Sequence, residues 1–193
     1  MTRGRPNPLH WTLPKRLRRE RVARGLSCTG LSVAAGVGHA SVSLIERGGR
    51  LPRLDTLERI AIALCVSPSW LAFGLGEQVW SPSGAGLRCE GLAERAHAAR
   101  LALGLSVRET DRRAGTGEGA FKLIERGAMP TPDTLELVAK ALGVSPAWLA
   151  FGEGPRELAR RGKQEAALTP KKQRPTQSPG SASRLATEAA RGE

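Results

Sequence analysis

The chain has 193 residues, of which 30 are lysine or arginine and 18 are aspartate or glutamate, so its formal net charge is +12. This balance favours a polyanionic partner such as nucleic acid, although a basic solvated surface produces the same total. No apolar run approaches the roughly 18 residues of a membrane helix, and the start of the chain lacks the apolar core of a secretory signal. We therefore expect a cytoplasmic protein that does not span a membrane.

Cysteine and histidine are too few and too scattered to build a site. The chain has three of each, without the paired spacing of a zinc site or the even count of a disulfide framework. It also lacks a glycine-rich phosphate loop followed by lysine, and any Ser/His/Asp or Cys/His arrangement for nucleophilic catalysis. The sequence predicts no metal, no cofactor and no enzymatic activity.

An internal repeat organises the chain. A segment that begins at Arg21 with RVARGLS and ends with SPSWLAFG returns at Arg100, beginning with RLALGLS and ending with SPAWLAFG, and about half of the aligned positions are identical. This period is longer than that of solenoid repeats and indicates a duplicated domain. The predicted parts are a basic arm (1–12), copy one (13–76), a Gly-, Pro- and Ser-rich linker (77–89), copy two (90–154) and a disordered basic tail (155–193).

Each copy is predicted to contain five short helices. Gly25 is a typical C-terminal glycine for the first helix, Ser27 can cap the second, and Ser67 followed by Pro68 can open the fifth. Apolar residues at helical spacing mark the fourth. The helices expected in copy one span about 14–24, 27–35, 39–47, 54–64 and 67–73. Copy two repeats this pattern, and no segment alternates like a strand, so the predicted fold class is all-α.

Several motifs recur together in both copies: Gly-Leu-Ser before the second helix, Ala-Gly after it, LIERG at the end of the third, and DTLE followed by VSP and WLAFG. In this combination the chain resembles the phage-repressor and Cro-like helix-turn-helix proteins of the XRE family. The resemblance covers residues 13–76 and 90–154 and implies two tandem five-helix lambda-repressor-like domains. In that family the third helix lies in the major groove. The implied function is a sequence-specific, double-stranded DNA-binding transcriptional regulator, with repression by occlusion as its simplest mode.

The resemblance places the reading helix of copy one at residues 38–46. Histidine and serine can exchange hydrogen bonds with base edges, and alanine can contact a thymine methyl group. The expected base-reading residues are His39, Ala40, Ser41, Ser43 and Leu44. The expected phosphate contacts are Arg19, Ser27, Cys28, Arg47, Arg50 and Arg53.

Charge separates the two copies. Copy one holds ten basic and four acidic residues (net +6), whereas copy two holds eight and nine (net −1). Because phosphate binding depends on lysine and arginine, copy one is expected to dominate DNA affinity. In copy two the matching positions are Glu118, Gly119, Lys122 and Arg126; Glu118 would repel phosphate, and a glycine within a helix costs about 1 kcal/mol. We interpret copy two as a degenerate or dimerising module, with a second reader of different specificity as the alternative.

The resemblance also implies two structural ion pairs. An arginine of the first helix would meet the glutamate that ends the third, as Arg21 with Glu46 and as Arg100 with Glu125. Two tryptophans, Trp70 and Trp148, stand between a Ser-Pro cap and Leu-Ala-Phe, which favours core packing over stacking on bases.

Two organisations fit this sequence. In the first, the chain acts as an intrachain pseudo-dimer, or as a homodimer, on two half-sites about one helical turn apart. In the second, copy one anchors to DNA while copy two and the tail recruit a protein partner, as in an antitoxin-like or interaction module. Both predict a cytoplasmic, nucleoid-associated protein whose partner is double-stranded DNA.

Overall fold

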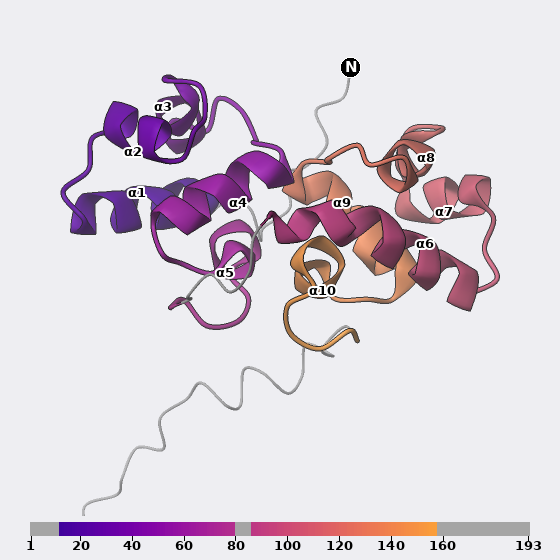
Figure 1. Cartoon of the computed structure of the whole chain (residues 1–193). Coiled ribbons are helices and arrows are strands. Elements are labelled where there is room, and N and C mark those ends of the chain that lie inside the picture. The colour runs from indigo at the N-terminus through magenta and orange to yellow at the C-terminus, as the bar shows by residue number, and fades with distance from the viewer. Residues whose placement is uncertain (1–11, 80–85, 158–193) are drawn as a thin grey trace, which may run out of the picture. The chain divides into compact units, whose positions relative to one another are not determined.

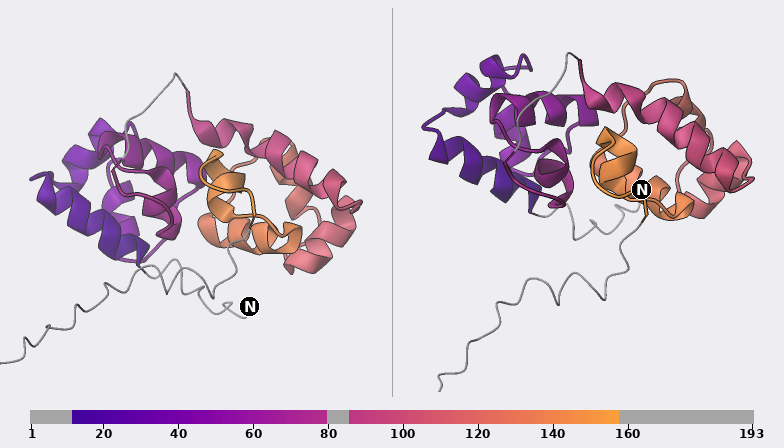
Figure 2. Two further views of the ribbon diagram at one scale, coloured as in Figure 1. Left: turned by 90° about the horizontal axis from the view of Figure 1, so that it is seen from below. Right: turned by 60° about the horizontal axis from the view of Figure 1, so that its bottom comes forward.

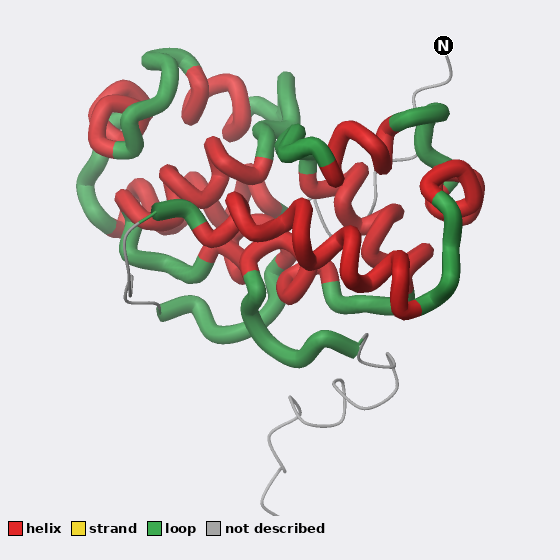
Figure 3. The backbone as a smooth tube through the Cα atoms, turned by 45° about the vertical axis from the view of Figure 1, so that its right-hand side comes forward, coloured by secondary structure: helices red, strands yellow, loops and turns green. Residues whose placement is uncertain are grey.

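The computed structural model describes residues 12–79 and 86–157. In these two stretches the regular structure is helical, apart from two isolated β-bridges that join Val66 to Val79 and Val144 to Glu157 (Figure 3). The predicted all-α fold is confirmed. The expected arm lies outside the described residues except for Thr12, and so does the expected tail beyond residue 157.

Copy one forms its helices in the predicted order (Figure 1). They are α1 (Leu13–Ala23), α2 (Cys28–Ala34), α3 (Ser41–Glu46), α4 (Leu54–Ala63) and α5 (Pro68–Phe73). The expected helix-ending and helix-capping residues are present: Gly25 follows α1 with φ +65°, and the Ser27 hydroxyl accepts the N–H of Gly30 at 2.9 Å. The Ser67 hydroxyl likewise accepts the N–H of Trp70 at 3.2 Å and caps α5.

Copy two repeats this order after a short 3-10 helix. Its elements are η1 (Arg88–Gly91), α6 (Leu92–Ala102), α7 (Val107–Ala114), α8 (Ala120–Glu125), α9 (Pro132–Leu142) and α10 (Pro146–Phe151). The helix η1 was not predicted from the sequence. It begins inside the stretch expected to be linker, and the other end of that stretch is also ordered, because the N–H of Ser67 donates to the carbonyl of Gln78.

The helices of each copy gather into a bundle (Figure 2), and the buried apolar residues of the two copies form one continuous cluster. In copy one, Leu17 of α1 and Val42 of α3 are fully buried. In copy two, Phe121 occupies the position of Val42 and is fully buried, while the smaller Ala96 occupies that of Leu17. A larger and a smaller side chain at two core positions leave the core volume largely unchanged, the kind of replacement that packed interiors tolerate.

Both tryptophans lie at the edge of a core. Trp70 and Trp148 are half-buried and pack against the buried apolar residues. The guanidinium of Arg19 lies 5.3 Å from the ring centroid of Trp70, and that of Arg156 lies 5.1 Å from that of Trp148. Each indole therefore packs on the core and is also covered by an arginine, a cation–π arrangement.

The two copies contact each other through their last helices. The rings of Phe73 in α5 and Phe151 in α10 are 6.3 Å apart. The fully buried carboxylate of Glu58 in α4 accepts the N–H groups of Arg88 and Cys89 at 2.7 and 2.9 Å. The Ser67 hydroxyl donates to the Glu153 carboxylate at 2.9 Å. The start of copy two is therefore fixed to copy one by hydrogen bonds.

Candidate nucleic-acid interface

The helix expected to read bases in copy one is shorter than predicted. Because α3 begins at Ser41, His39 and Ala40 lie in the turn before it, with Ala40 as the N-cap. The backbone turns at Gly36, which has φ +61°, and the N–H of Ser41 donates to the carbonyl of Gly38. The expected helix start at residue 39 was therefore wrong.

Five residues were expected to read bases, and they differ in exposure. His39 and Ala40 are exposed, Leu44 is 45% exposed, and Ser41 and Ser43 are half-buried. The surface available to a partner is therefore made by the turn before α3 together with one side of the helix.

An ion pair fixes the far end of α3. Arg21 of α1 donates from Nε to Glu46 Oε1 at 2.7 Å and from a terminal nitrogen to Oε2 at 2.8 Å, and it also donates to the carbonyl of Leu26. The hydrogen bonds to Glu46 raise the pKa of Arg21, so the guanidinium stays charged. This bidentate geometry ties α1, the following turn and α3 together.

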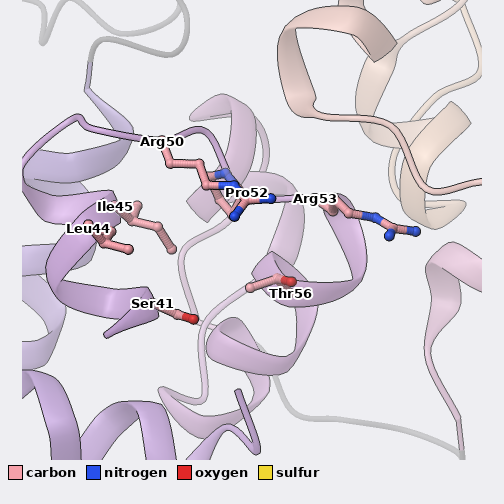
Figure 4. A pocket seen from close by; sticks show the side chains of 7 residues that line it. All are labelled: Ser41, Leu44, Ile45, Arg50, Pro52, Arg53 and Thr56. Atoms are coloured by element: carbon pink, nitrogen blue, oxygen red, sulfur yellow. The ribbon is translucent and has the colours of Figure 1, made fainter. Parts of the chain in front are cut away.

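A shallow hollow borders α3 (Figure 4). Its volume is about 160 Å³, and its lining residues are Ser41, Leu44, Ile45, Arg50, Pro52, Arg53 and Thr56. Arg53 extends away from Leu44 and Ile45 and donates from Nε to the carbonyl of Met129 in copy two at 3.2 Å.

The residues expected to contact phosphate do not form one group. Arg47, the C-cap of α3, and Arg50 are exposed beside the reading helix. Ser27 caps α2, and the thiol of Cys28 lies 3.9 Å from a Glu46 oxygen. Arg19 lies elsewhere, because its guanidinium bonds Glu20 and stacks on Trp70 of α5.

Much of the positive charge of α1 is engaged within the fold. Arg16 donates to the carbonyls of Leu71 and Ala72, and burial, followed by the nearby charge of Arg19, lowers the pKa of Arg16 to about 10. Arg24 pairs with Glu20 at 3.0 Å. The net charge of +6 therefore overstates the cations that copy one can present to a partner.

In copy two, Gly119 lies outside the helix. It is the N-cap of α8 and has φ +81°, a left-handed conformation that L-residues adopt at a cost. The expected loss of stability from a glycine within a helix therefore does not apply, and that interpretation was wrong.

A buried carboxylate anchors the start of α8. Asp111 is 4% exposed and accepts the N–H groups of Gly119 and Phe121, both at 2.8 Å, and the hydroxyl of Thr116 at 3.0 Å. In copy one the same position is Ser32, whose hydroxyl accepts the N–H of Val42 at 3.4 Å. The sequence reasoning missed Asp111, although an acid aligned with a serine of the repeat was a visible signal.

The expected second reader is exposed. Arg108 and Glu118 have side chains 89% and 85% exposed, and Lys122 and Arg126 are also exposed. Glu125 is held by Arg100 at 2.9 Å, and His97 Nδ1 lies 3.0 Å from the same oxygen. The adjoining hollow, of about 560 Å³, is lined by Val107, Arg108, Asp111, Glu118, Gly119, Lys122, Glu125 and Arg126.

Neither a metal-ligand cluster nor a membrane-spanning helix occurs in the two described stretches. Within them no group of three or more His, Cys, Asp or Glu side chains is placed to hold a metal ion. None of the helices found there is long and apolar enough to cross a membrane.

Comparison with known proteins identifies both copies. Residues 13–72 match a family described as "Helix-turn-helix domain", and residues 97–149 match one described as "Helix-turn-helix". No solved structure matches the chain. The chain belongs to the helix-turn-helix proteins of the Cro/XRE type and carries two of their domains in tandem. These domains are regulatory DNA-binding modules, which supports a DNA-binding regulator.

Proposed function

We propose that this protein is a sequence-specific regulator of transcription that binds double-stranded DNA and represses by occluding its operator. The reading element is α3 of copy one together with the turn before it. The observation that carries the proposal is the exposed surface made by His39, Ala40 and Leu44, with Arg47 and Arg50 at its edge, on a domain of the helix-turn-helix family.

In this proposal, an imidazole, two hydroxyls and two apolar side chains recognise the bases. His39 and the hydroxyls of Ser41 and Ser43 exchange hydrogen bonds with base edges, while Ala40 and Leu44 contact thymine methyl groups. Such contacts discriminate only modestly, so positioning by the phosphate backbone contributes much of the affinity.

Arg47 and Arg50 supply the phosphate contacts, because both are exposed beside α3. Each arginine that neutralises a phosphate releases counterions, so the affinity falls steeply with salt. Ser27 caps the start of α2. In this proposal that end of α2 lies against the sugar-phosphate backbone of the DNA, as helix-turn-helix docking places it.

A single chain presents both domains to one operator as an intrachain pseudo-dimer. The support for this arrangement is the set of contacts between the copies, in which α5 meets α10 and Glu58 holds the N–H groups of Arg88 and Cys89. Helix-turn-helix dimers place their heads on half-sites one helical turn apart.

The test is selection of bound duplexes from a random-sequence library at near-physiological salt, with full-length protein. We expect an enriched motif, and we expect Arg47→Ala with Arg50→Ala to lower the slope of log affinity against log salt by about 0.9 for each phosphate that is no longer neutralised. Arg59→Ala is the matched control, since Arg59 is an exposed arginine of α4 that is not among the proposed contacts. Failure to bind duplex DNA would refute the proposal, and binding without an enriched motif would refute its sequence specificity.

A further inference from the structure

We propose that copy two is a second base-reading head with its own specificity, so that the operator consists of two unlike half-sites. This inference rests on the proposed function, DNA binding by the chain, and it assigns to the α7–α8 surface a major-groove site of different sequence. It replaces the interpretation of copy two as a degenerate module.

The first support is the charge on the reading surface itself. Residues 28–47 of copy one contain one cation, Arg47, and one acid, Glu46. Residues 107–126 of copy two contain five basic and four acidic residues. Two of those acids, Asp111 and Glu125, are engaged with partners inside the domain. The other two acids, Glu109 and Glu118, form surface ion pairs with Arg112, Arg113 and Arg108. Among the described residues, Lys122 and Arg126 are the cations of this segment outside these ion pairs, compared with Arg47 alone in the matching segment of copy one.

The second support is the anchoring of the reading helix. A degenerating module would be expected to lose the interactions that orient α8, but the start of α8 has more of them than the start of α3. Asp111 accepts three hydrogen bonds at its start, whereas Ser32 accepts one longer bond in copy one. At its other end, Arg100 donates to Glu125 through Nε alone at 2.9 Å, whereas Arg21 holds Glu46 through two nitrogens, and His97 supplies a second contact to Glu125. A rigidly held helix is what base recognition requires.

The third support is the chemistry of the exposed positions. Lys122 occupies the position of Ser43, and Glu118 occupies that of His39. A lysine donates to the O6 and N7 acceptors of guanine, and a glutamate accepts from the N4 amino group of cytosine. Arg126, and Arg108 beside its ion-pair partner Glu118 at 3.9 Å, also line the adjoining hollow, where their guanidinium groups can meet phosphates. The half-site read by copy two is therefore richer in G·C pairs than the one read by copy one.

The unlike half-sites are read at a set spacing. The Phe73–Phe151 contact and the hydrogen bonds from Arg88 and Cys89 to Glu58 join the two copies directly. One chain then recognises a site without two-fold symmetry, which an exact homodimer of single domains would not select.

The experiment repeats the library selection with four single variants of the full chain. Lys122→Ala and Glu118→Gln alter copy two, His39→Ala alters copy one, and Lys140→Ala is the control on the exposed side of α9. The altered side chains are exposed, and circular dichroism checks that each variant is folded. We expect the unaltered protein to select two unlike half-sites.

Lys122→Ala is expected to erase preference in one half-site only and to weaken binding to the selected duplex about tenfold. His39→Ala should affect the other half-site, and Lys140→Ala neither. The proposal is overturned if the motif has one half-site or two identical ones, or if Lys122→Ala and Glu118→Gln leave the motif and affinity unchanged, as they would if copy two bound a protein instead. Loss of all duplex binding by the unaltered chain would instead refute the proposed function.

Discussion

At the scale of single residues, Cys65 is held in an unfavourable conformation. It follows α4 with φ +50°, and the matching residue after α9 is Gly143 with φ +67°. An L-residue in this left-handed region costs about 1–2 kcal/mol, which glycine avoids. Copy two therefore carries at this turn the residue that the backbone conformation favours.

We predict that Cys65→Gly stabilises the protein. Glycine removes the cost of the left-handed conformation in the folded state. It also gives the unfolded chain more conformational entropy, which costs about 0.4–1 kcal/mol of stability, and we expect the first effect to be the larger. The free energy of unfolding should rise by about 0.5 kcal/mol in urea denaturation. Gly143→Ala is the mirrored control and should lower it. A loss of stability in Cys65→Gly would contradict this account of the turn.

Glu20 is a buried carboxylate whose charge is stabilised by arginines. It is 5% exposed, and burial alone would raise its pKa, but hydrogen bonds and charge from Arg19 and Arg24 outweigh burial and lower the pKa below the ordinary value of 4.5. A lowered pKa in the folded state means that the charged form favours folding. The stabilisation is present above the ordinary pKa and is lost as the pH falls through the lowered one.

We predict that Glu20→Gln reduces the loss of stability on acidification. Urea denaturation from about pH 7 to about pH 3 should show a shallower decline below pH 4.5 for the variant than for the unaltered protein. Glu94→Gln, at an exposed position of α6, should leave the decline unchanged. Identical profiles for Glu20→Gln and the unaltered chain would remove the assigned role of this carboxylate.

At the scale of elements, each copy fastens its first helix to its last in the same way. Arg16 in α1 donates to two carbonyls at the end of α5, and Arg95 in α6 donates to those of Leu149 and Ala150 at the end of α10. These carbonyls have no partner within their own helix, and a cation at a helix C-terminus also favours the helix dipole. The arginines therefore stabilise short helices of six residues.

We predict that replacing the buried Asp111 destabilises α8. Asp111→Ser reproduces the residue of copy one and removes a charged acceptor from two backbone N–H groups, at a cost of about 1–3 kcal/mol. Amide hydrogen exchange should quicken in α8 more than in α3. Ser145→Ala is a suitable control, since its hydroxyl caps no N–H of α10. Unchanged exchange at Phe121 would show that this carboxylate does not anchor the helix.

Element order was readable from the sequence, because its signals are local. Ser27, Gly25 and Ser67 mark helix ends through their own backbone and side-chain chemistry. The starts of α3 and α8 were not readable in this way. From the sequence alone, Ala40 and Gly119 could each be the first residue of a helix or the N-cap before it. The conformation of the preceding turn makes both of them N-caps.

At the scale of the whole molecule, a count of charges along the chain does not show which charges can meet a partner. Arg16 and Arg19 belong to copy one but contact α5, and Asp111 counts as an acid although it is buried. Only the fold reveals which charges are neutralised within a domain. The motifs of the repeat therefore predicted the class of protein, whereas the charges that each copy exposes could be assessed only from the fold.

The ends of the linker were misjudged for a similar reason. Gln78, Arg88 and Cys89 have no pattern that predicts order, and their partners, Ser67 and Glu58, are distant in the sequence. The carboxylate of Glu58 satisfies two N–H groups at the start of η1, which would otherwise be costly to bury. The contact between the copies thus depends on a pairing that local sequence does not reveal.

If one chain supplies both reading heads, the stoichiometry of the DNA complex is one to one. Sedimentation equilibrium of full-length protein with the duplex selected from the library would give the number of chains bound. We expect one chain on a duplex with two half-sites, and loss of that complex when either half-site is scrambled. Two chains per duplex, one on each half-site, would contradict it and assign the second half-site to a second molecule.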